Sequence, residues 1–174
     1  IIHVQKDYEV AIETALGGSI QNIVTDNEQT AKRMIGFLKK NRFGRATFLP
    51  LSNISGRGGL NQRDVLSEPG VVGTANTLVN ADKEYSELVM YLLGRVLVVD
   101  NIDHAIAIGK KYRHSLRMVT IEGESLSPGG SMTGGAFKNN SNLLGRRREI
   151  EELERSVGIL RKELEETQKS IGEN

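Results

Sequence analysis

Apolar residues spaced four positions apart predict a helix near the start of the chain. In residues 7–16, Ile12 and Leu16 lie on one helical face, and Gly17 follows as a residue type that ends helices. Residues 21–25 then form a short run rich in β-branched side chains, which is typical of a strand. The chain is therefore expected to begin with a helix and then a short strand.

A second helix is predicted directly after this strand. Asp26 is a residue type that caps helix N-termini, and Gln29 follows three positions later as a capping-box partner. Asn41 and Gly44 end the helical pattern, and residues 45–51 are expected to form the next strand. The apolar stripe of this helix is predicted to consist of Ala31, Met34, Ile35 and Leu38.

The second half of the chain repeats the order helix, strand, helix, strand. Asp100 and Asn101 occupy the places of Asp26 and Asn27, between the strand and the second helix of each unit. This internal similarity predicts a mixed α/β (α+β) body of two subdomains related by a pseudo-twofold axis. The matching segments are residues 85–94 with 10–18, residues 96–105 with 22–31, and residues 116–123 with 46–51.

The segment between the two halves is rich in serine, asparagine, glycine and arginine, which predicts a long loop. We therefore expect a first subdomain at residues 1–51, incomplete at its N-terminal side, and a connecting loop at residues 52–70. A second subdomain is expected at residues 71–142. Residues 143–174 follow a different pattern and are predicted to start a coiled-coil arm.

The arm carries apolar side chains at alternating spacings of three and four, as the a and d positions of a coiled coil do. A helix of this kind is not stable alone in water, because its apolar seam needs a partner. No second heptad run exists in the 174 residues, so we expect the matching arm to lie upstream of Ile1 in a longer chain. The predicted seam consists of Ile150, Leu153, Val157, Leu160, Leu164 and Ile171.

The amino-acid composition limits the cellular compartments and the kinds of binding site that we expect. The chain has no cysteine, which excludes disulfides and cysteine-containing zinc sites and fits a reducing compartment. No apolar run reaches the roughly 18 residues of a membrane span, and the first ten residues lack the pattern of a signal peptide. We therefore expect a cytoplasmic protein without a membrane partner.

The net charge of +1 hides an uneven distribution. Residues 29–63 contain eight lysines and arginines and no acidic residue, whereas glutamates crowd the C-terminal arm. A basic surface attracts nucleic-acid phosphates, but cations at the end of a helix also stabilise its C-terminus. Both interpretations apply to the basic group that we predict to contact DNA, which is Lys39, Lys40, Arg42 and Arg45.

An ordered set of segments resembles the hinge of the structural maintenance of chromosomes (SMC) family. The resemblance implies a non-enzymatic, SMC hinge-like domain that joins two coiled-coil arms. It also implies a ring-shaped homodimer, with the first subdomain of one copy against the second subdomain of the other. The matching segments are YEVAIETALGG, QNIVTDNEQTA, GRATFLPL, YLLGRVLVVD, VTIEGE and SPGGSMTGG, followed by LLGR at the start of the arm.

The same resemblance implies that the ATPase head and the kleisin partner lie outside this segment, in a protein that works at the nucleoid. DNA is the second expected partner, contacted near the junction with the arm. The family often has a lysine cluster after SMTGG, where this chain has only one lysine, so we expect weak DNA binding. The junction residues predicted to contact DNA are Lys138, Arg146, Arg147 and Arg148.

By the resemblance, the dimer contact is expected in the glycine-rich loop. Paired glycines let another backbone approach closely. From composition alone, an ordinary flexible loop remains an alternative. A phosphate-binding loop is excluded because Gly135 is followed by Ala136 rather than by lysine and a hydroxyl residue. The residues predicted at the dimer contact are Gly129, Gly130, Met132, Gly134 and Gly135.

No catalytic residue, metal site or cofactor site emerges from the sequence. His3, His104 and His114 are dispersed, with no spacing that places two of them together beside carboxylates. Two rival functions remain. One is a sequence-independent nucleic-acid-binding module in which dimerisation is incidental. The other is a small transferase or nuclease that uses residues 52–70 as a lid, which would need convergent acid, base or metal-binding residues.

Overall fold

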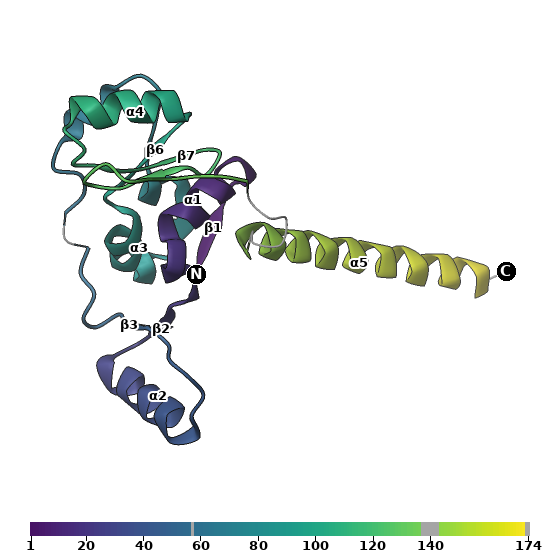
Figure 1. Ribbon diagram of the computed structural model, residues 1–174. Coiled ribbons are helices and arrows are strands. Elements are labelled where there is room, and N and C mark those ends of the chain that lie inside the picture. The colour runs from purple at the N-terminus through teal and green to yellow at the C-terminus, as the bar shows by residue number, and fades with distance from the viewer. Residues whose placement is uncertain (57, 137–142, 173–174) are drawn as a thin grey trace. The chain divides into compact units, whose positions relative to one another are not determined.

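The computed structural model describes residues 1–56, 58–136 and 143–172, without the side chains of residues 171 and 172. The chain divides into two compact units, Ile1–Phe137 and Lys138–Asn174. Sheets and the helices α1 to α4 belong to the first unit, and the long helix α5 belongs to the second (Figure 1).

The first half of the first unit alternates short strands and helices. β2 and β3 pair in parallel, and a parallel pair requires a crossover, which α2 supplies. The elements are β1 (Ile2–Val4), a 3₁₀ turn (Lys6–Tyr8), α1 (Glu9–Leu16), a second 3₁₀ turn (Gly17–Gln21), β2 (Ile23–Thr25), α2 (Glu28–Asn41) and β3 (Phe48–Pro50).

The second half contains the same order of elements, with β4 added before it and a hairpin after it. β6 and β7 again pair in parallel, with α4 as the crossover. The elements are 3₁₀ turns at Arg63–Ser67, Ala75–Leu78 and Lys83–Tyr85, the helices α3 (Ser86–Leu93) and α4 (Ile102–Lys111), and the strands β4 (Val71–Thr74), β5 (Val79–Ala81), β6 (Val96–Val99), β7 (Arg117–Thr120), β8 (Ser125–Leu126) and β9 (Met132–Thr133).

The repeat predicted from the sequence is therefore present in the order of the elements. β1 and β5 are counterparts in the two halves, and they pair with each other in antiparallel register, Ile2 opposite Ala81 and Val4 opposite Val79. Antiparallel pairing of equivalent strands is what a local twofold axis produces. The expected mixed α/β fold is confirmed by these helices and sheets.

A five-stranded sheet forms the centre of the first unit, in the order β4-β6-β7-β8-β9. All four residues of β6 are buried, because helices cover both faces of the sheet. Figure 1 shows α4 on one side of β6 and β7, and α1 and α3 on the other. The core cluster beneath α4 consists of Val65, Leu97, Val99, Ala105, Ile108, Leu116, Met118 and Leu126.

Some contacts within the first unit cross the predicted subdomain boundary at residue 51. β1 pairs with β5, and α1 packs against β7 of the second half. α2 packs instead on its own strands, β2 and β3. The subdomain boundaries stay a prediction, while the pairing shows that the two halves share part of their packing.

Two local predictions need correction. Asn27, not Asp26, is the N-cap of α2, and its side-chain oxygen accepts a hydrogen bond from Thr30 N at 2.9 Å. Asp26 accepts from the backbone and side-chain nitrogens of Asn27 and thereby orients the cap. The expected loop at residues 52–70 also contains an ordered 3₁₀ turn, because Val65 is fully buried in the core.

This 3₁₀ turn is attached to the end of α4 by polar contacts. The Tyr112 hydroxyl donates to Asp64 Oδ2 at 2.9 Å, and Lys111 forms an ion pair with Glu68. Desolvation raises the pKa of Tyr112 to about 12, and the hydrogen bond to Asp64 adds to the rise. The connecting segment is therefore held against the second half of the chain.

The arm predicted at residues 143–174 forms one continuous helix, α5 (Leu143–Gly172). Its acidic and basic side chains make pairs one turn apart, such as Arg148 with Glu152. Among the described residues, no helix combines the length and apolar character that crossing a membrane requires.

Candidate self-association interface

The glycine-rich loop forms an exposed β-hairpin at the edge of the five-stranded sheet. β9 pairs with β8 on one side only, Leu126 opposite Met132 and Ser125 opposite Thr133. Within the described residues no further strand covers the other edge of β9. Residues 128–136 are all exposed, and Met132 presents 51% of its surface to solvent. An open strand edge with an exposed apolar side chain is a surface that another strand can extend.

Gly129 and Gly130 build the turn of this hairpin. Both have left-handed backbone conformations, with φ of 91° and 97°. Gly130 N donates to Ser127 O at 3.0 Å, and Ser127 N donates to Ser131 O at 2.9 Å. Any other residue at either glycine would be strained, so the turn itself requires them. Close approach by a partner is not needed to explain these two glycines.

Gly134 and Gly135 follow the edge strand. A Cβ atom at Gly134 would lie 3.2 Å from Glu124 Cγ, tighter than ordinary contact, whereas a Cβ at Gly135 would meet nothing within 4 Å. Gly135 has φ of 135°, which again favours glycine. The structure thus brings the five predicted contact residues together on one exposed hairpin. Their contact with a second copy stays a prediction.

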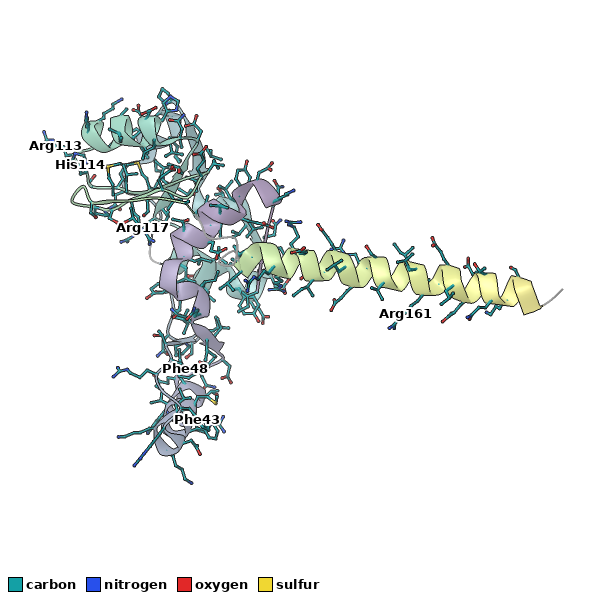
Figure 2. All side chains as sticks on the ribbon, turned by 45° about the vertical axis from the view of Figure 1, so that its right-hand side comes forward. Phe43, Phe48, Arg113, His114, Arg117 and Arg161 are labelled. Atoms are coloured by element: carbon teal, nitrogen blue, oxygen red, sulfur yellow. The ribbon has the colours of Figure 1, made fainter. Side chains whose placement is uncertain are left out.

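His114 supports the hairpin, although sequence reasoning treated it only as a dispersed histidine. Its carbonyl accepts from Gly129 N at 2.8 Å, and its backbone nitrogen donates to Gly109 O at 2.7 Å. Arg113 and His114 both have positive φ, 54° and 52°, at the turn after α4 (Figure 2). Histidine is among the non-glycine residue types that are enriched at positive φ, but this preference does not single out His114 from the other histidines of the chain, so the sequence alone did not indicate its role.

The basic group predicted on the first subdomain gathers at the end of α2. Lys39 and Lys40 are exposed in its last turn, and Arg42 ends the helix with φ of 55°. Arg45 is exposed three residues later, close in sequence to the exposed aromatic ring of Phe43 (Figure 2). Arg42 is therefore the C-cap of α2, and all four cations are exposed at this end of the helix.

The arginines at the start of α5 are partly engaged. Arg147 Nε lies 3.2 Å from Glu151 Oε1, and Arg148 Nη1 lies 3.0 Å from Glu152 Oε1, each one turn along the helix. Arg146 is exposed and also interacts with a neighbouring group. Lys138 lies outside the described residues. These arginines belong to the second unit, whereas the cations of α2 belong to the first.

The predicted seam of α5 lies along one exposed face. Its side chains from Ile150 to Leu164 are between 47% and 63% exposed, which is unusual for apolar residues in a stable fold. Ile150, Leu153 and Val157 line a shallow apolar groove with Gly158. Ile171 belongs to the helix, and its side chain lies outside the described part. The heptad pattern predicts a partner helix for this face, and that partner stays a prediction.

Among the described residues, no group of three or more histidines and carboxylates lies close enough to hold a metal ion. Two carboxyl groups have lowered pKa values: a hydrogen bond from His104 lowers the pKa of Asp100, and a hydrogen bond from Thr30 lowers the pKa of Asp26. These contacts sit at the starts of α4 and α2 and serve the helix caps.

The chain matches known proteins along most of its length. It is 44% identical over 153 residues to the chromosome partition protein Smc of Clostridium kluyveri, covering 87% of this chain and 13% of that protein. It is 43% identical over 182 residues to the chromosome partition protein Smc of Bacillus subtilis, covering 98% of this chain and 15% of the relative. The chain therefore spans about one seventh of these relatives.

The chain is also similar to solved structures of SMC hinge domains. The crystal structure of an asymmetric dimer of the Geobacillus stearothermophilus SMC hinge domain matches with a TM-score of 0.81 and 42% identity, over 93% of this chain and 66% of that one. The Pyrococcus furiosus Smc hinge domain with an extended coiled coil matches with a TM-score of 0.67 and 32% identity, over 94% of this chain and 57% of that one. The family model for the SMC proteins flexible hinge domain matches residues 1–109. Because that model covers more than half of the chain, the chain belongs to the SMC flexible hinge domain family.

Proposed function

We propose that this chain is the homodimerisation hinge of a chromosome condensation and segregation protein and joins two coiled-coil arms. The observation that carries the proposal is the exposed β9 edge with its flanking glycines, on a fold that resembles a hinge solved as a dimer. The ATPase head and the kleisin-binding region would belong to other parts of a longer cytoplasmic, nucleoid-associated protein. The hinge itself would perform no catalysis and need no cofactor.

Dimerisation would use strand addition at β9. The free N–H and C=O groups of an edge strand pair with a strand from a second copy, and small residues beside the strand let the two backbones approach. The partner surface would come from the first subdomain of the other copy. That subdomain exposes apolar side chains that a contact could bury, including Ile23 on β2 and the packed ring pair Phe37 and Phe43, whose centroids lie 5.8 Å apart.

The direct test is molar mass by light scattering across a dilution series. The variant Gly134→Glu, Gly135→Glu adds charge and bulk beside β9 and should convert a dimer into a monomer. Because added side chains are tight at Gly134 and strained at Gly135, Met132→Lys provides a second variant that changes only an exposed side chain. Gly18→Glu is the matched control, since it faces open space on an unstrained backbone.

A folded monomer in both interface variants, checked by circular dichroism, would support the proposal. A wild-type chain that stays monomeric at the highest concentration would contradict dimerisation by this segment. Dimers that persist in Met132→Lys and in the glycine variant would place the contact elsewhere.

Weak, sequence-independent DNA contact forms the second part of the proposal. It is supported by the exposed cations at the end of α2, because clustered lysines and arginines bind phosphates with strong salt dependence. Charge reversal at Lys39 and Lys40 should weaken the binding of a labelled duplex and reduce its salt dependence. The rival nucleic-acid module predicts strong binding at physiological salt that survives enlargement of Gly130 or Gly134.

A further inference from the structure

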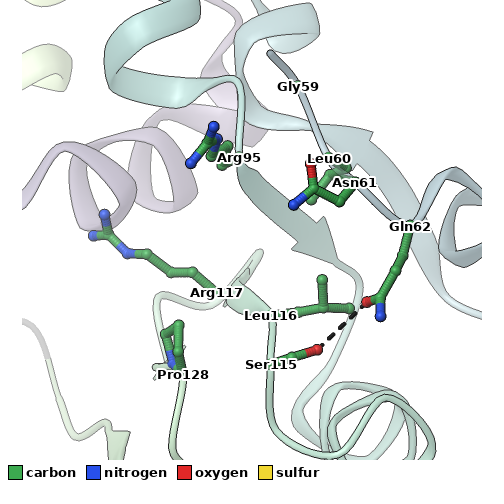
Figure 3. Close-up of a pocket in the computed structure, with 9 residues that line it drawn as sticks. All are labelled: Gly59, Leu60, Asn61, Gln62, Arg95, Ser115, Leu116, Arg117 and Pro128. Atoms are coloured by element: carbon green, nitrogen blue, oxygen red, sulfur yellow. Dashed lines mark hydrogen bonds between the residues drawn. The ribbon is translucent and has the colours of Figure 1, made fainter. Parts of the chain in front are cut away.

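A pocket of about 320 Å³ lies where the connecting segment meets the N-terminal ends of β6 and β7. All of its lining residues belong to the first unit, and none of them lies on α2. Figure 3 shows its walls, which come from four places in the chain. The polar residues that line it are Asn61, Gln62, Arg95, Ser115 and Arg117.

Two arginines reach this pocket from neighbouring strands. Arg95 immediately precedes β6, and Arg117 begins β7. Because Val96 is paired with Arg117 in the parallel ladder, the two arginines lie at the same end of adjacent strands. Figure 3 shows them on the same side of the pocket.

Backbone contacts hold both guanidinium groups in position. Arg117 is half-buried, and its Nη2 donates to Ala15 O on α1 at 2.8 Å. Arg95 Nε donates to Gly58 O at 3.4 Å. A guanidinium group has five N–H donors, so the bond to Ala15 orients Arg117 while using one of them. An arginine that is already oriented loses little side-chain freedom when it binds a ligand.

The remaining lining also suits an anion. No acidic side chain is among the nine residues that line the pocket, and Asn61 and Gln62 bring side-chain amides. The Ser115 hydroxyl has a single hydrogen, which it donates to Tyr112 O at 2.7 Å, and Gln62 Oε1 lies 3.4 Å from Ser115 Oγ. Side chains that carry N–H donors therefore line the pocket from three segments, residues 61–62, Arg95 and Arg117. That arrangement suits the tetrahedral oxygens of a phosphate better than a planar carboxylate, which one guanidinium fork can satisfy.

We propose that this pocket binds a phosphate group, with Arg95 and Arg117 as its charged contacts and the amides of Asn61 and Gln62 as further donors. The phosphate could belong to a free ion or to the backbone of a nucleic acid. The site is independent of strand addition at β9, so a failure of the dimer model would leave it standing.

The test titrates the full chain with inorganic phosphate at constant ionic strength, with chloride as the comparison salt. Backbone amide shifts of Asn61, Gln62 and Ser115 in ¹⁵N spectra report on the pocket. Arg95→Gln and Arg117→Gln should each weaken the response by at least about tenfold, since each removes one of two charged contacts. Arg33→Gln on the exposed face of α2 is the matched control and should leave it unchanged.

Arg117 also bonds to α1, so the Arg117→Gln result is interpreted only if this variant has a native circular dichroism spectrum. If Arg117→Gln misfolds, Arg95→Gln still tests the proposal.

A second titration with a short single-stranded oligonucleotide distinguishes a free phosphate ion from a nucleic-acid backbone. Shifts of the same amides by DNA, weakened in Arg95→Gln, would assign the site to a nucleic-acid backbone. Shifts by phosphate alone would assign it to a free ion. Equal shifts with chloride, unchanged shifts in Arg95→Gln, or no shifts with either probe would overturn the proposal.

Discussion

Asn27 and Asn101 cap equivalent helices with the same geometry. Asn27 has φ −147° and ψ 173° before α2, and Asn101 has φ −148° and ψ 168° before α4. Each side-chain oxygen accepts a hydrogen bond from the backbone nitrogen three residues later, at 2.9 Å in both cases. The two halves thus share the conformation at the strand-to-helix junction as well as the order of elements.

Loss of either cap should destabilise its helix by about 1 kcal/mol, the usual value for replacing an asparagine N-cap by alanine. Asn101→Ala should lower the free energy of global unfolding in urea, because α4 packs on the core. Asn27→Ala should instead reduce hydrogen-exchange protection mainly within α2, because the main packing of α2 is on β2 and β3. Asn80→Ala on β5 is the control. If both cap variants lowered the free energy of global unfolding equally, the expected difference between a local effect at α2 and a global effect at α4 would be contradicted.

Replacement of a core leucine should have a much larger effect than replacement of a seam leucine. Leu97 is completely buried on β6, so Leu97→Ala should lower the free energy of unfolding by about 2–5 kcal/mol. Leu160 is 63% exposed on α5, so Leu160→Ala should leave unfolding of the body nearly unchanged. The measurement is urea denaturation followed by fluorescence or circular dichroism. A large effect of Leu160→Ala on the body would show that α5 stabilises it.

Tyr112 should ionise at an unusually high pH. Its folded-state pKa is raised to about 12 by desolvation and by Asp64, above the ordinary 10.0. The neutral phenol therefore contributes stability that is fully present below pH 10 and is lost as the pH rises from 10 through 12. The difference between the ultraviolet titrations of wild type and Tyr112→Phe isolates this residue. A difference signal centred near pH 10 would refute the contact with Asp64.

Asp100 should titrate below its ordinary pKa. The hydrogen bond with His104, 2.7 Å between Nδ1 and Oδ1, is the main cause of the lowered pKa. A lowered folded-state pKa gives stability above the unfolded pKa of about 3.8, and that stability is lost as the pH falls through the folded value. His104→Ala should move the carboxyl pKa of Asp100 toward its ordinary value in ¹³C spectra. Asp26, whose pKa is lowered by Thr30, should not move and serves as the internal control.

Local signals in the sequence were sufficient for much of the fold. The helices α2 and α4 follow from apolar spacing and from the polar residues before them, and α5 follows from its heptads. The cap prediction failed by one residue, at Asp26 instead of Asn27, because both residue types can cap a helix. Only the backbone conformation decides which of two adjacent caps is used.

The sequence predicted which residues form the candidate interface, but it did not predict that they form a β-hairpin. Its glycines are visible in the sequence, whereas the position of β9 at the edge of the sheet depends on the order in which distant strands pair. His114 supports the turn in a left-handed conformation, and the moderate preference of histidine for that conformation does not distinguish it from the other histidines in the sequence. Strand order and burial depend on contacts far apart in the sequence, so periodicity cannot specify them.

By itself, the sequence determined the repeat, the helical periods, the arm and the family, because these depend on short-range patterns and on an ordered set of motifs. The tertiary structure alone decided that β1 pairs with β5, that Val65 is buried within an apparent loop, and that Arg95 and Arg117 meet at one pocket. The physical reason is that each of these features joins segments distant in the chain. Their meeting depends on how the whole chain buries its apolar surface.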